Sequence, residues 1–221
     1  MIAAWPCPGP DGPSEEYAVS FDRGRPRRLL IVPALFDEAN RTRRFLIETM
    51  RLLDRAGIDS ILPDLPGCNE SLRPFGGESL ESWQAAMAAA IRHFACNEVL
   101  SLRAGSLIAP AVPGWQLEPL AGRSQLRQLL RARTIAAREE GRSETIEGLL
   151  ELGRREGLDL AGYACSAALL GGLEHGEPVQ GQRPIRQADL GGGALWLRSE
   201  PGEAPDQSSA LAAILAAGLA P

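Results

Sequence analysis

The sequence contains no lysine and no excess of positive charge. All 23 of its basic residues are arginine, set against 28 acidic residues, so the net charge is −5 and the pI is about 5.2. Such a chain has no overall positive field to hold nucleic acid or an anionic membrane. We therefore expect no nucleic-acid partner. An arginine-only composition is what a GC-rich coding bias produces, and we draw no function from it.

Long hydrophobic runs and paired cysteines are also missing. No stretch approaches the roughly 18 uninterrupted apolar residues of a membrane-spanning helix, and the first residues lack a signal-like segment. We expect a cytoplasmic protein with no membrane span. The four cysteines are widely spaced and form no C-x-x-C pair. Neither a zinc site nor a disulfide framework is indicated, and we expect no metal and no cofactor.

The apolar residues that are present, 44% of the chain, follow the pattern of an α/β protein. Residues 1–26 are rich in proline and glycine. Within them Tyr17, Val19 and Phe21 alternate with polar residues, and this alternation predicts antiparallel edge structure. Short apolar runs predict buried strands at 29–35, 58–65 and 98–102. Amphipathic stretches predict helices at 38–56, with Gly57 as the stop, and from Ser79 to about Phe94. Alternating strands and helices predict a mostly parallel central sheet flanked by helices.

The second half of the chain changes character. A further short strand is expected at 115–117, and two arginine- and glutamate-rich helical stretches fill about 123–157. We interpret those stretches as a small helical cap inserted into a single domain of residues 1–221. Further elements are expected at 158–163, in a helix ending near Leu173, in a strand at 194–197 (ALWL) and in a helix at 208–219.

Three segments resemble the α/β-hydrolases. Residues 29–40 (LLIVPALFDEAN) resemble the strand and loop that supply part of their oxyanion hole. Residues 64–71 (DLPGCNES) are similar to their D-x-P-G-x-G-x-S turn, and 99–110 (VLSLRAGSLIAP) occupies the place of their nucleophile elbow. The resemblance implies the fold of this superfamily.

A finer resemblance is carried by PALFDEANRTRR, LSLRAGSLIA and GWQLEPLAGRSQLRQLLRAR. These segments are most similar to the hydrolase-like proteins associated with bacterial exosortase systems. That resemblance implies a setting in the export of exopolysaccharide and sorted surface proteins.

The elbow carries an unexpected residue. A nucleophile elbow has small residues two positions to either side of the nucleophile, because the turn is tight and strained. Ser101 and Gly105 satisfy the small positions, which leaves Arg103 in the nucleophile slot. A guanidinium stays protonated and has no lone pair suited to acyl attack, so Arg103 cannot be an acyl nucleophile.

Substitutes for the missing triad are weak. Ser101 and Ser106 lie two residues before and three residues after the slot. No histidine follows His175 in this sequence, and His93 precedes the elbow, so we expect both histidines to be structural. Asp189 and Glu200 flank the expected 194–197 strand but have no imidazole to orient. We expect Asp64 to hydrogen-bond within its own turn.

Arg103 needs a negative partner, because the start of a helix already carries partial positive charge. One hypothesis is a partner carboxylate from Asp37, Glu38 or Glu118. The other is an anionic ligand held by the Arg103 guanidinium, by the backbone N–H groups of Ala104 and Phe36, and beside Glu118.

A positive stripe is predicted on the first cap helix. Arg123, Arg127 and Arg131 recur every four residues, and a stripe of this kind is usually a solvated face. Neutralisation by nearby acidic residues is expected, from Glu139, Glu140, Glu144 and Glu147. Docking of an acidic protein partner is the alternative.

Taken together, these patterns predict an α/β-hydrolase-fold protein without a recognisable triad, acting in binding or as an accessory. An active hydrolase of small esters or thioesters that uses Ser101, Ser106 or Cys96 is the alternative, and an anion-binding module is a third hypothesis. The ligand and the oligomeric state stay open.

Overall fold

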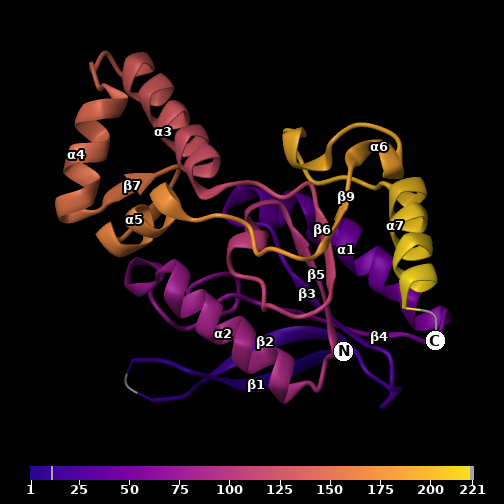
Figure 1. Cartoon of the computed structure of the whole chain (residues 1–221). Coiled ribbons are helices and arrows are strands. Elements are labelled where there is room, and N and C mark those ends of the chain that lie inside the picture. Colours follow the sequence, from indigo (N-terminus) through magenta and orange to yellow (C-terminus); the bar gives the residue numbers. More distant parts are fainter. Residues whose placement is uncertain (11, 220–221) are drawn as a thin grey trace.

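A mostly parallel sheet forms the centre of the molecule (Figure 1). The computed structural model describes residues 1–10 and 12–219, and within them seven strands lie in the order β1-β2-β4-β3-β5-β6-β9. Strands β3 to β6 and β9 pair in parallel, whereas β1 and β2 pair antiparallel at one edge. The strands span β1 Ile2–Cys7, β2 Ser14–Phe21, β3 Arg28–Val32, β4 Asp59–Pro63, β5 Glu98–Leu102, β6 Gly114–Leu117 and β9 Arg183–Ile185. The predicted fold class and the antiparallel edge are confirmed.

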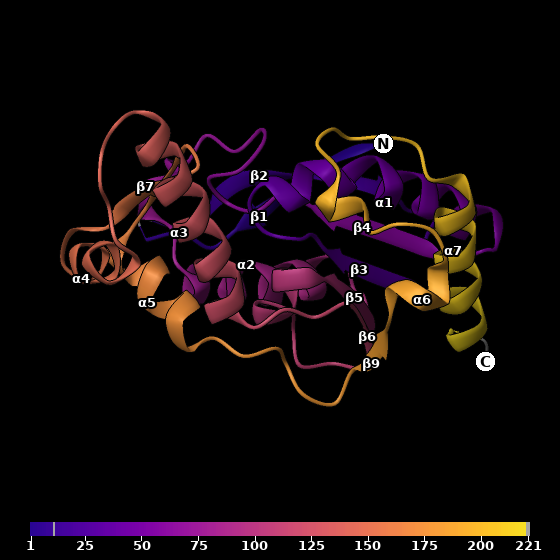
Figure 2. The same ribbon diagram turned by 90° about the horizontal axis from the view of Figure 1, so that it is seen from above.

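Helices cover both faces of this sheet (Figure 2). Leu29 and Ile31 of β3 belong to the hydrophobic cluster under α1 (Asp37–Arg55) and α7 (Pro205–Gly218). Leu30 and Val32 belong to the cluster under α2 (Leu80–His93). Successive side chains of a strand point to opposite faces, so a strand covered on both faces must be apolar throughout. The continuous apolar runs in the sequence have this cause.

Local signals in the sequence set the ends of the first two helices. Gly57 follows α1 with φ of 79°, a conformation that glycine adopts without a steric penalty. Ser79 caps α2: its hydroxyl accepts from the Ser82 N–H at 3.1 Å, and the Ser82 hydroxyl accepts from the Ser79 N–H at 2.9 Å. Both helix boundaries were predicted and are confirmed.

A second group of elements gathers at one end of the molecule (Figure 1). It comprises α3 (Gly122–Glu139), α4 (Ile146–Glu156), the hairpin of β7 (Leu158–Leu160) and β8 (Tyr163–Cys165), and α5 (Ala167–His175). Helices α3 and α4 occupy the range predicted for two helical stretches. That residues 1–221 form a single domain with a cap insertion remains a prediction.

The C-terminal region differs from the sequence prediction. The expected strand at 194–197 is wrong, because Leu195–Leu197 forms the short 3-10 helix η3. The last strand of the sheet is β9 instead, followed by α6 (Gln187–Leu190). Strand β9 has no apolar pattern: Arg183 and Pro184 are exposed, and a proline is tolerated at the edge of a sheet.

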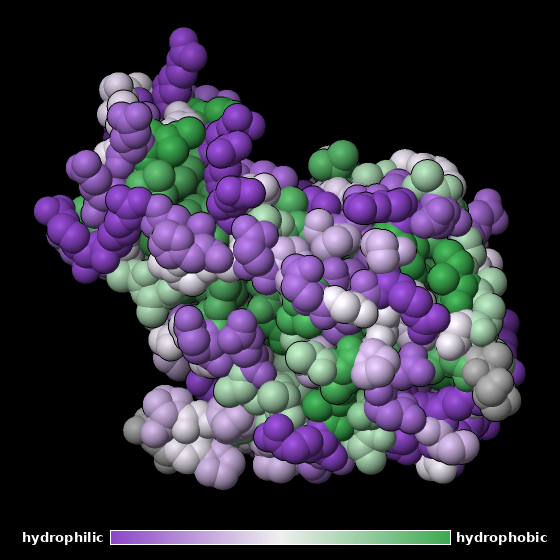
Figure 3. All heavy atoms as spheres, viewed as in Figure 1, coloured by the Kyte–Doolittle hydropathy of each residue, from purple (hydrophilic) through white to green (hydrophobic). Residues whose placement is uncertain are grey.

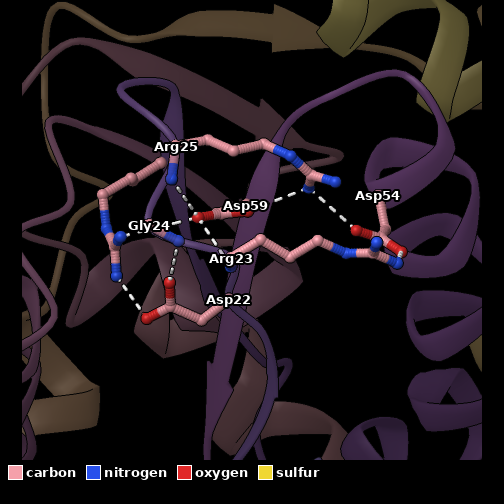
Figure 4. A network of polar contacts seen from close by, with 7 residues as sticks. Asp22, Arg23, Gly24, Arg25, Asp54 and Asp59 are labelled. Atoms are coloured by element: carbon pink, nitrogen blue, oxygen red, sulfur yellow. Dashed lines mark hydrogen bonds and ion pairs between the residues drawn. The ribbon is translucent and has the colours of Figure 1, made fainter.

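An ion-pair network lies at the amino ends of the parallel strands (Figure 4). The fully buried Asp59 accepts hydrogen bonds from the backbone N–H groups of Arg23 and Arg25 at 3.0 and 2.8 Å. The Arg25 guanidinium also donates to Asp59 and Asp54, at 2.9 and 2.8 Å. These contacts join the β2–β3 connection to α1 and β4, at the end of the sheet opposite the strand carboxyl ends.

Hydrophilic residues dominate the surface over α3 and α4 in the view of Figure 3. In residues 1–10 and 12–219, no helix combines the length and the apolar character needed to cross a bilayer.

Candidate functional site

Unusual backbone conformations gather at the carboxyl ends of the parallel strands. Six non-glycine residues of the described chain have positive φ, and three of them follow neighbouring strands: Phe36 after β3 (57°), Arg103 after β5 (51°) and Glu118 after β6 (46°). Such conformations are costly for residues with a side chain and concentrate at functional sites. The carboxyl edge of β3, β5 and β6 is therefore the candidate site.

Arg103 begins the 3-10 helix η2 (Arg103–Leu107), directly after β5, and the residue as a whole is only 7% exposed. Its Nε donates to Glu38 Oε2 at 3.0 Å and its Nη2 donates to Glu38 Oε1 at 3.4 Å. Its Nη1 donates to the Glu118 carbonyl at 3.1 Å, and the guanidinium lies 4.5 Å from the ring centre of Trp196. The side chain is thus held by three different parts of the chain.

The hypothesis of a partner carboxylate is confirmed for Glu38. Burial raises the pKa of Glu38, and the nearby Arg103 charge and hydrogen bonds oppose that rise. Glu118 contacts Arg103 through its carbonyl and not its carboxylate, which instead accepts from the Gln187 N–H at 2.7 Å. Asp37 accepts from the Tyr163 hydroxyl at 3.0 Å. The predicted alternatives, the carboxylates of Asp37 and Glu118, therefore have other hydrogen-bond partners.

Binding of an anion by Arg103, Ala104, Phe36 and Glu118 stays a prediction. Phe36 and Ala104 are both buried, and Arg103 already donates through three nitrogens. An anion at the guanidinium would have to replace Glu38 or share the guanidinium with it.

The hydroxyls and the thiol named as substitute nucleophiles are buried or occupied. Ser106 Oγ donates to the Arg103 carbonyl at 2.7 Å. Ser101 is fully buried within β5, and its Oγ has no hydrogen-bond partner in the described chain. Cys96 lies two residues before β5, at the opposite end of that strand from Arg103, and burial raises its pKa to about 12.

The histidines and the candidate acids lie in structural positions. His93 ends α2, before β5 begins, and is exposed; His175 ends α5 and is also exposed. Asp189 accepts from the Arg186 N–H at 2.7 Å at the start of α6, and Glu200 is exposed. Asp64 accepts from the Asn69 side chain at 2.7 Å, within its own turn as predicted.

The arginine stripe on α3 is exposed, but two of its expected neutralising residues are engaged elsewhere. Glu144 pairs with Arg133 and Arg142, and Glu140 pairs with Arg142. Arg123, Arg127 and Arg131 are all exposed. Docking of an acidic protein on this stripe stays a prediction.

A cavity of about 520 Å³ adjoins the turn that carries Phe36. Its walls come from the loops after β3 and β4, the 3-10 helix η1 (Phe75–Gly77), the start of α2 and the β7–β8 hairpin. Four of the chain's 11 aromatic residues line it: Phe36, Phe75, Trp83 and Tyr163. Sequence reasoning did not find this site, because these residues lie up to 127 positions apart and no motif joins them.

The wall of this cavity is uncharged. Cys68 contributes a thiol to the lining, and burial raises the pKa of this thiol to about 12, so it is uncharged at neutral pH. Burial, and then the neighbouring Asp37 carboxylate, raise the pKa of the Tyr163 hydroxyl. Among the described residues, no three His, Cys, Asp or Glu side chains are grouped so that they could hold a metal ion.

This sheet order, its flanking helices and the strand-to-helix turn after β5 define an α/β-hydrolase fold. A solved structure of α/β-hydrolase domain-containing protein 10 from mouse superposes with a TM-score of 0.55 at 11% identity, covering 84% of this chain and 77% of that one. No sequence profile of a known family matches the chain, and no curated protein matches it.

Two other solved structures are similar at lower TM-scores. A proline iminopeptidase-related protein from Thermus thermophilus has a TM-score of 0.46 at 17% identity over 71% of this chain. Proline iminopeptidase from Mycobacterium smegmatis has a TM-score of 0.42 at 16% identity over 70% of this chain. The chain spans 56% and 61% of the lengths of these two proteins.

Proposed function

We propose that this chain is a non-catalytic binding or accessory protein built on the α/β-hydrolase fold. The observation that carries the proposal is the position of Arg103 at the strand-to-helix turn after β5, with its guanidinium paired to Glu38. Acyl transfer at that turn requires a nucleophile with an available lone pair, and a protonated guanidinium has none.

The space in front of the turn supports the same proposal. Trp196 lies against the Arg103 guanidinium and is itself buried, while the Trp196 carbonyl accepts from Arg41 at 3.0 Å. These contacts fill the volume beside the guanidinium with protein side chains. The neighbouring cavity of about 520 Å³ is a space that a ligand could occupy.

The finer parts of the proposal rest on the resemblance of three segments to exosortase-associated proteins. In this proposal, the chain is a cytoplasmic, single-domain accessory protein of exopolysaccharide export, and residues 123–157 form its cap. Deletion of its gene from a host with an exosortase system should change exopolysaccharide export. Unchanged export would remove this setting and leave the binding role untouched.

Ester turnover tests the absence of catalysis. We expect the purified protein to hydrolyse p-nitrophenyl acetate no faster than buffer alone. The Ser143→Ala variant, which alters an exposed serine on the α3–α4 connection, should behave like the wild-type protein. Arg103→Ser should also be inactive, because a hydroxyl without a bonded imidazole is a weak nucleophile.

The alternative, an active hydrolase with an unconventional nucleophile, predicts a different result. Turnover by the wild-type protein that disappears in Ser106→Ala, Ser101→Ala or Cys96→Ala, but persists in Ser143→Ala, would overturn the proposal.

A further inference from the structure

The cavity beside Phe36 has a defined size and a mainly apolar wall. Its volume of about 520 Å³ lies within the roughly 300–1,000 Å³ range of small-molecule sites. Leu65, Pro33 and Ala34 contribute apolar surface from the ends of β3 and β4. A molecule of one or two fused rings matches a space of this volume.

Aromatic rings in the wall contact one another in arrangements that are favourable for aromatic pairs. The Phe36 and Tyr163 ring centres lie 5.2 Å apart at 81°, and those of Phe75 and Tyr163 lie 5.1 Å apart at 48°. Phe75 and Trp83 lie 5.8 Å apart at 62°. Edge-to-face and tilted arrangements of this kind are favourable for aromatic pairs. Phe75 and Tyr163 are only half-buried, so part of each ring is available to a ligand.

The charge around the cavity argues against an ionic ligand. Its described lining contains no Asp, Glu, Arg, Lys or His. An anion placed there would lose water without gaining an opposite charge, which is costly. The carboxylates of Asp37 and Asp64 accept hydrogen bonds from the lining residues Tyr163 and Asn69, and they would repel an anion.

A cation would find these two carboxylates already engaged. Asp64 accepts from Arg43 at 2.7 Å as well as from Asn69, and Arg41 lies 3.7 Å from Asp37. Polar groups that a neutral ligand could use are the side chains of Asn40 and Asn69, which are exposed and line the cavity.

We propose that this cavity binds an uncharged aromatic small molecule, packed against Phe36, Phe75 and Tyr163. The inference rests on the proposed binding function and names the ligand class of its site. It assigns ligand recognition to this aromatic wall and not to the Arg103 guanidinium.

Calorimetric titration of the full chain with three probes tests the proposal. The probes are 2-naphthol, which is neutral, 2-naphthoate, which is an anion, and phenyltrimethylammonium, which is a cation. We expect 2-naphthol to bind at least about tenfold more tightly than either ion. Preference for the anion, preference for the cation, or no binding of 2-naphthol would each overturn the proposal.

Two variants place the binding in this cavity. Phe75→Ala should weaken 2-naphthol binding by roughly tenfold, whereas Phe21→Ala, which alters a half-buried ring on β2 outside the cavity, should leave it unchanged. Ala164→Trp adds a large side chain at an exposed residue of the cavity lining and leaves the core intact. This variant should abolish 2-naphthol binding.

Equal binding by wild type, Phe75→Ala and Ala164→Trp would overturn the proposal. Because binding is measured without an ester substrate, its failure leaves the ester-turnover test of the proposed function intact.

Discussion

Arg103 combines a strained backbone with a buried charge, and Glu38 is the residue that makes this combination tolerable. The guanidinium and the carboxylate each expose only 9% of their side chains. A buried charge without its partner is strongly destabilising, whereas replacing both members of a pair by apolar residues is often neutral. The Glu38–Arg103 pair therefore acts as a unit.

We expect Glu38→Gln to lower the free energy of unfolding by about 3 kcal/mol, because the Arg103 charge would remain buried without a carboxylate. Urea denaturation measures this loss. Glu48→Gln is the matched control: Glu48 pairs with the half-exposed Arg44 on the surface of α1, and its loss should cost under about 1 kcal/mol.

The double variant Glu38→Leu/Arg103→Met should recover most of the stability lost in Glu38→Gln. A double variant that loses as much stability as Glu38→Leu and Arg103→Met added together would show that the two side chains do not act as a pair.

At the scale of elements, the N-terminus of α1 joins the elbow to the β7–β8 hairpin. Its first residue, Asp37, accepts from the Tyr163 hydroxyl of β8, and its second residue, Glu38, pairs with Arg103 after β5. The hairpin has only two short strands of its own, and such hairpins are marginal alone. Its position over the cavity therefore depends on contacts such as that of Tyr163.

Tyr163→Phe should loosen the hairpin without unfolding the protein. Losing one hydrogen bond worth about 1 kcal/mol corresponds to roughly fivefold faster local opening. Hydrogen exchange of the amides in residues 158–165 measures it. Tyr17→Phe on β2 is the control and should leave exchange in the hairpin unchanged; equal exchange in the Tyr163→Phe variant and the wild type would contradict the role of this contact.

At the scale of the whole molecule, two sets of carboxyl groups respond to pH in opposite directions. Hydrogen bonds from Arg28 lower the pKa of Asp22, and those from Arg25 and Arg23 lower the pKa of Asp54, from an ordinary value of 3.8. Burial raises the pKa of the Glu16 carboxyl from an ordinary value of 4.5.

Proton linkage gives the direction in which each group changes the stability of the fold with pH. A lowered pKa in the folded state stabilises the fold above the ordinary value of 3.8, and that stability is lost as the pH falls from 3.8 through the folded pKa. A raised pKa stabilises the fold below the ordinary value of 4.5, and that stability is lost as the pH rises through the folded pKa. Maximum stability is therefore expected between pH 3.8 and pH 4.5.

Urea denaturation between about pH 3 and pH 8 tests this curve. Glu16→Gln should flatten the decline on the alkaline side, because Glu16 is fully buried and one of its carboxylate oxygens has no partner in the described chain. A stability that rises steadily from pH 5 to about pH 8 would contradict the assignment to Glu16.

The predictable part of this protein is the part in which neighbouring residues determine the outcome. Apolar runs, the Ser79 cap and the Gly57 stop are local, and they predicted the central strands and helices, because these signals act within one or two turns of chain. The 194–197 segment was ambiguous for the same reason: four apolar residues suit a strand or a buried turn equally well, and packing of Trp196 on Arg103 accompanies the turn.

The sequence alone determined that Arg103, the residue directly after the strand at 98–102, cannot attack an acyl group, because a guanidinium keeps its charge wherever it is placed. Tertiary structure decided which of three carboxylates pairs with Arg103, since only side-chain direction separates Asp37, Glu38 and Glu118. It also decided that Phe36, Phe75, Trp83 and Tyr163 share one cavity. Hydrophobic association depends on buried apolar area and not on separation along the chain. Aromatic rings that are far apart in the sequence therefore produce no local sequence pattern from which their contact could be predicted.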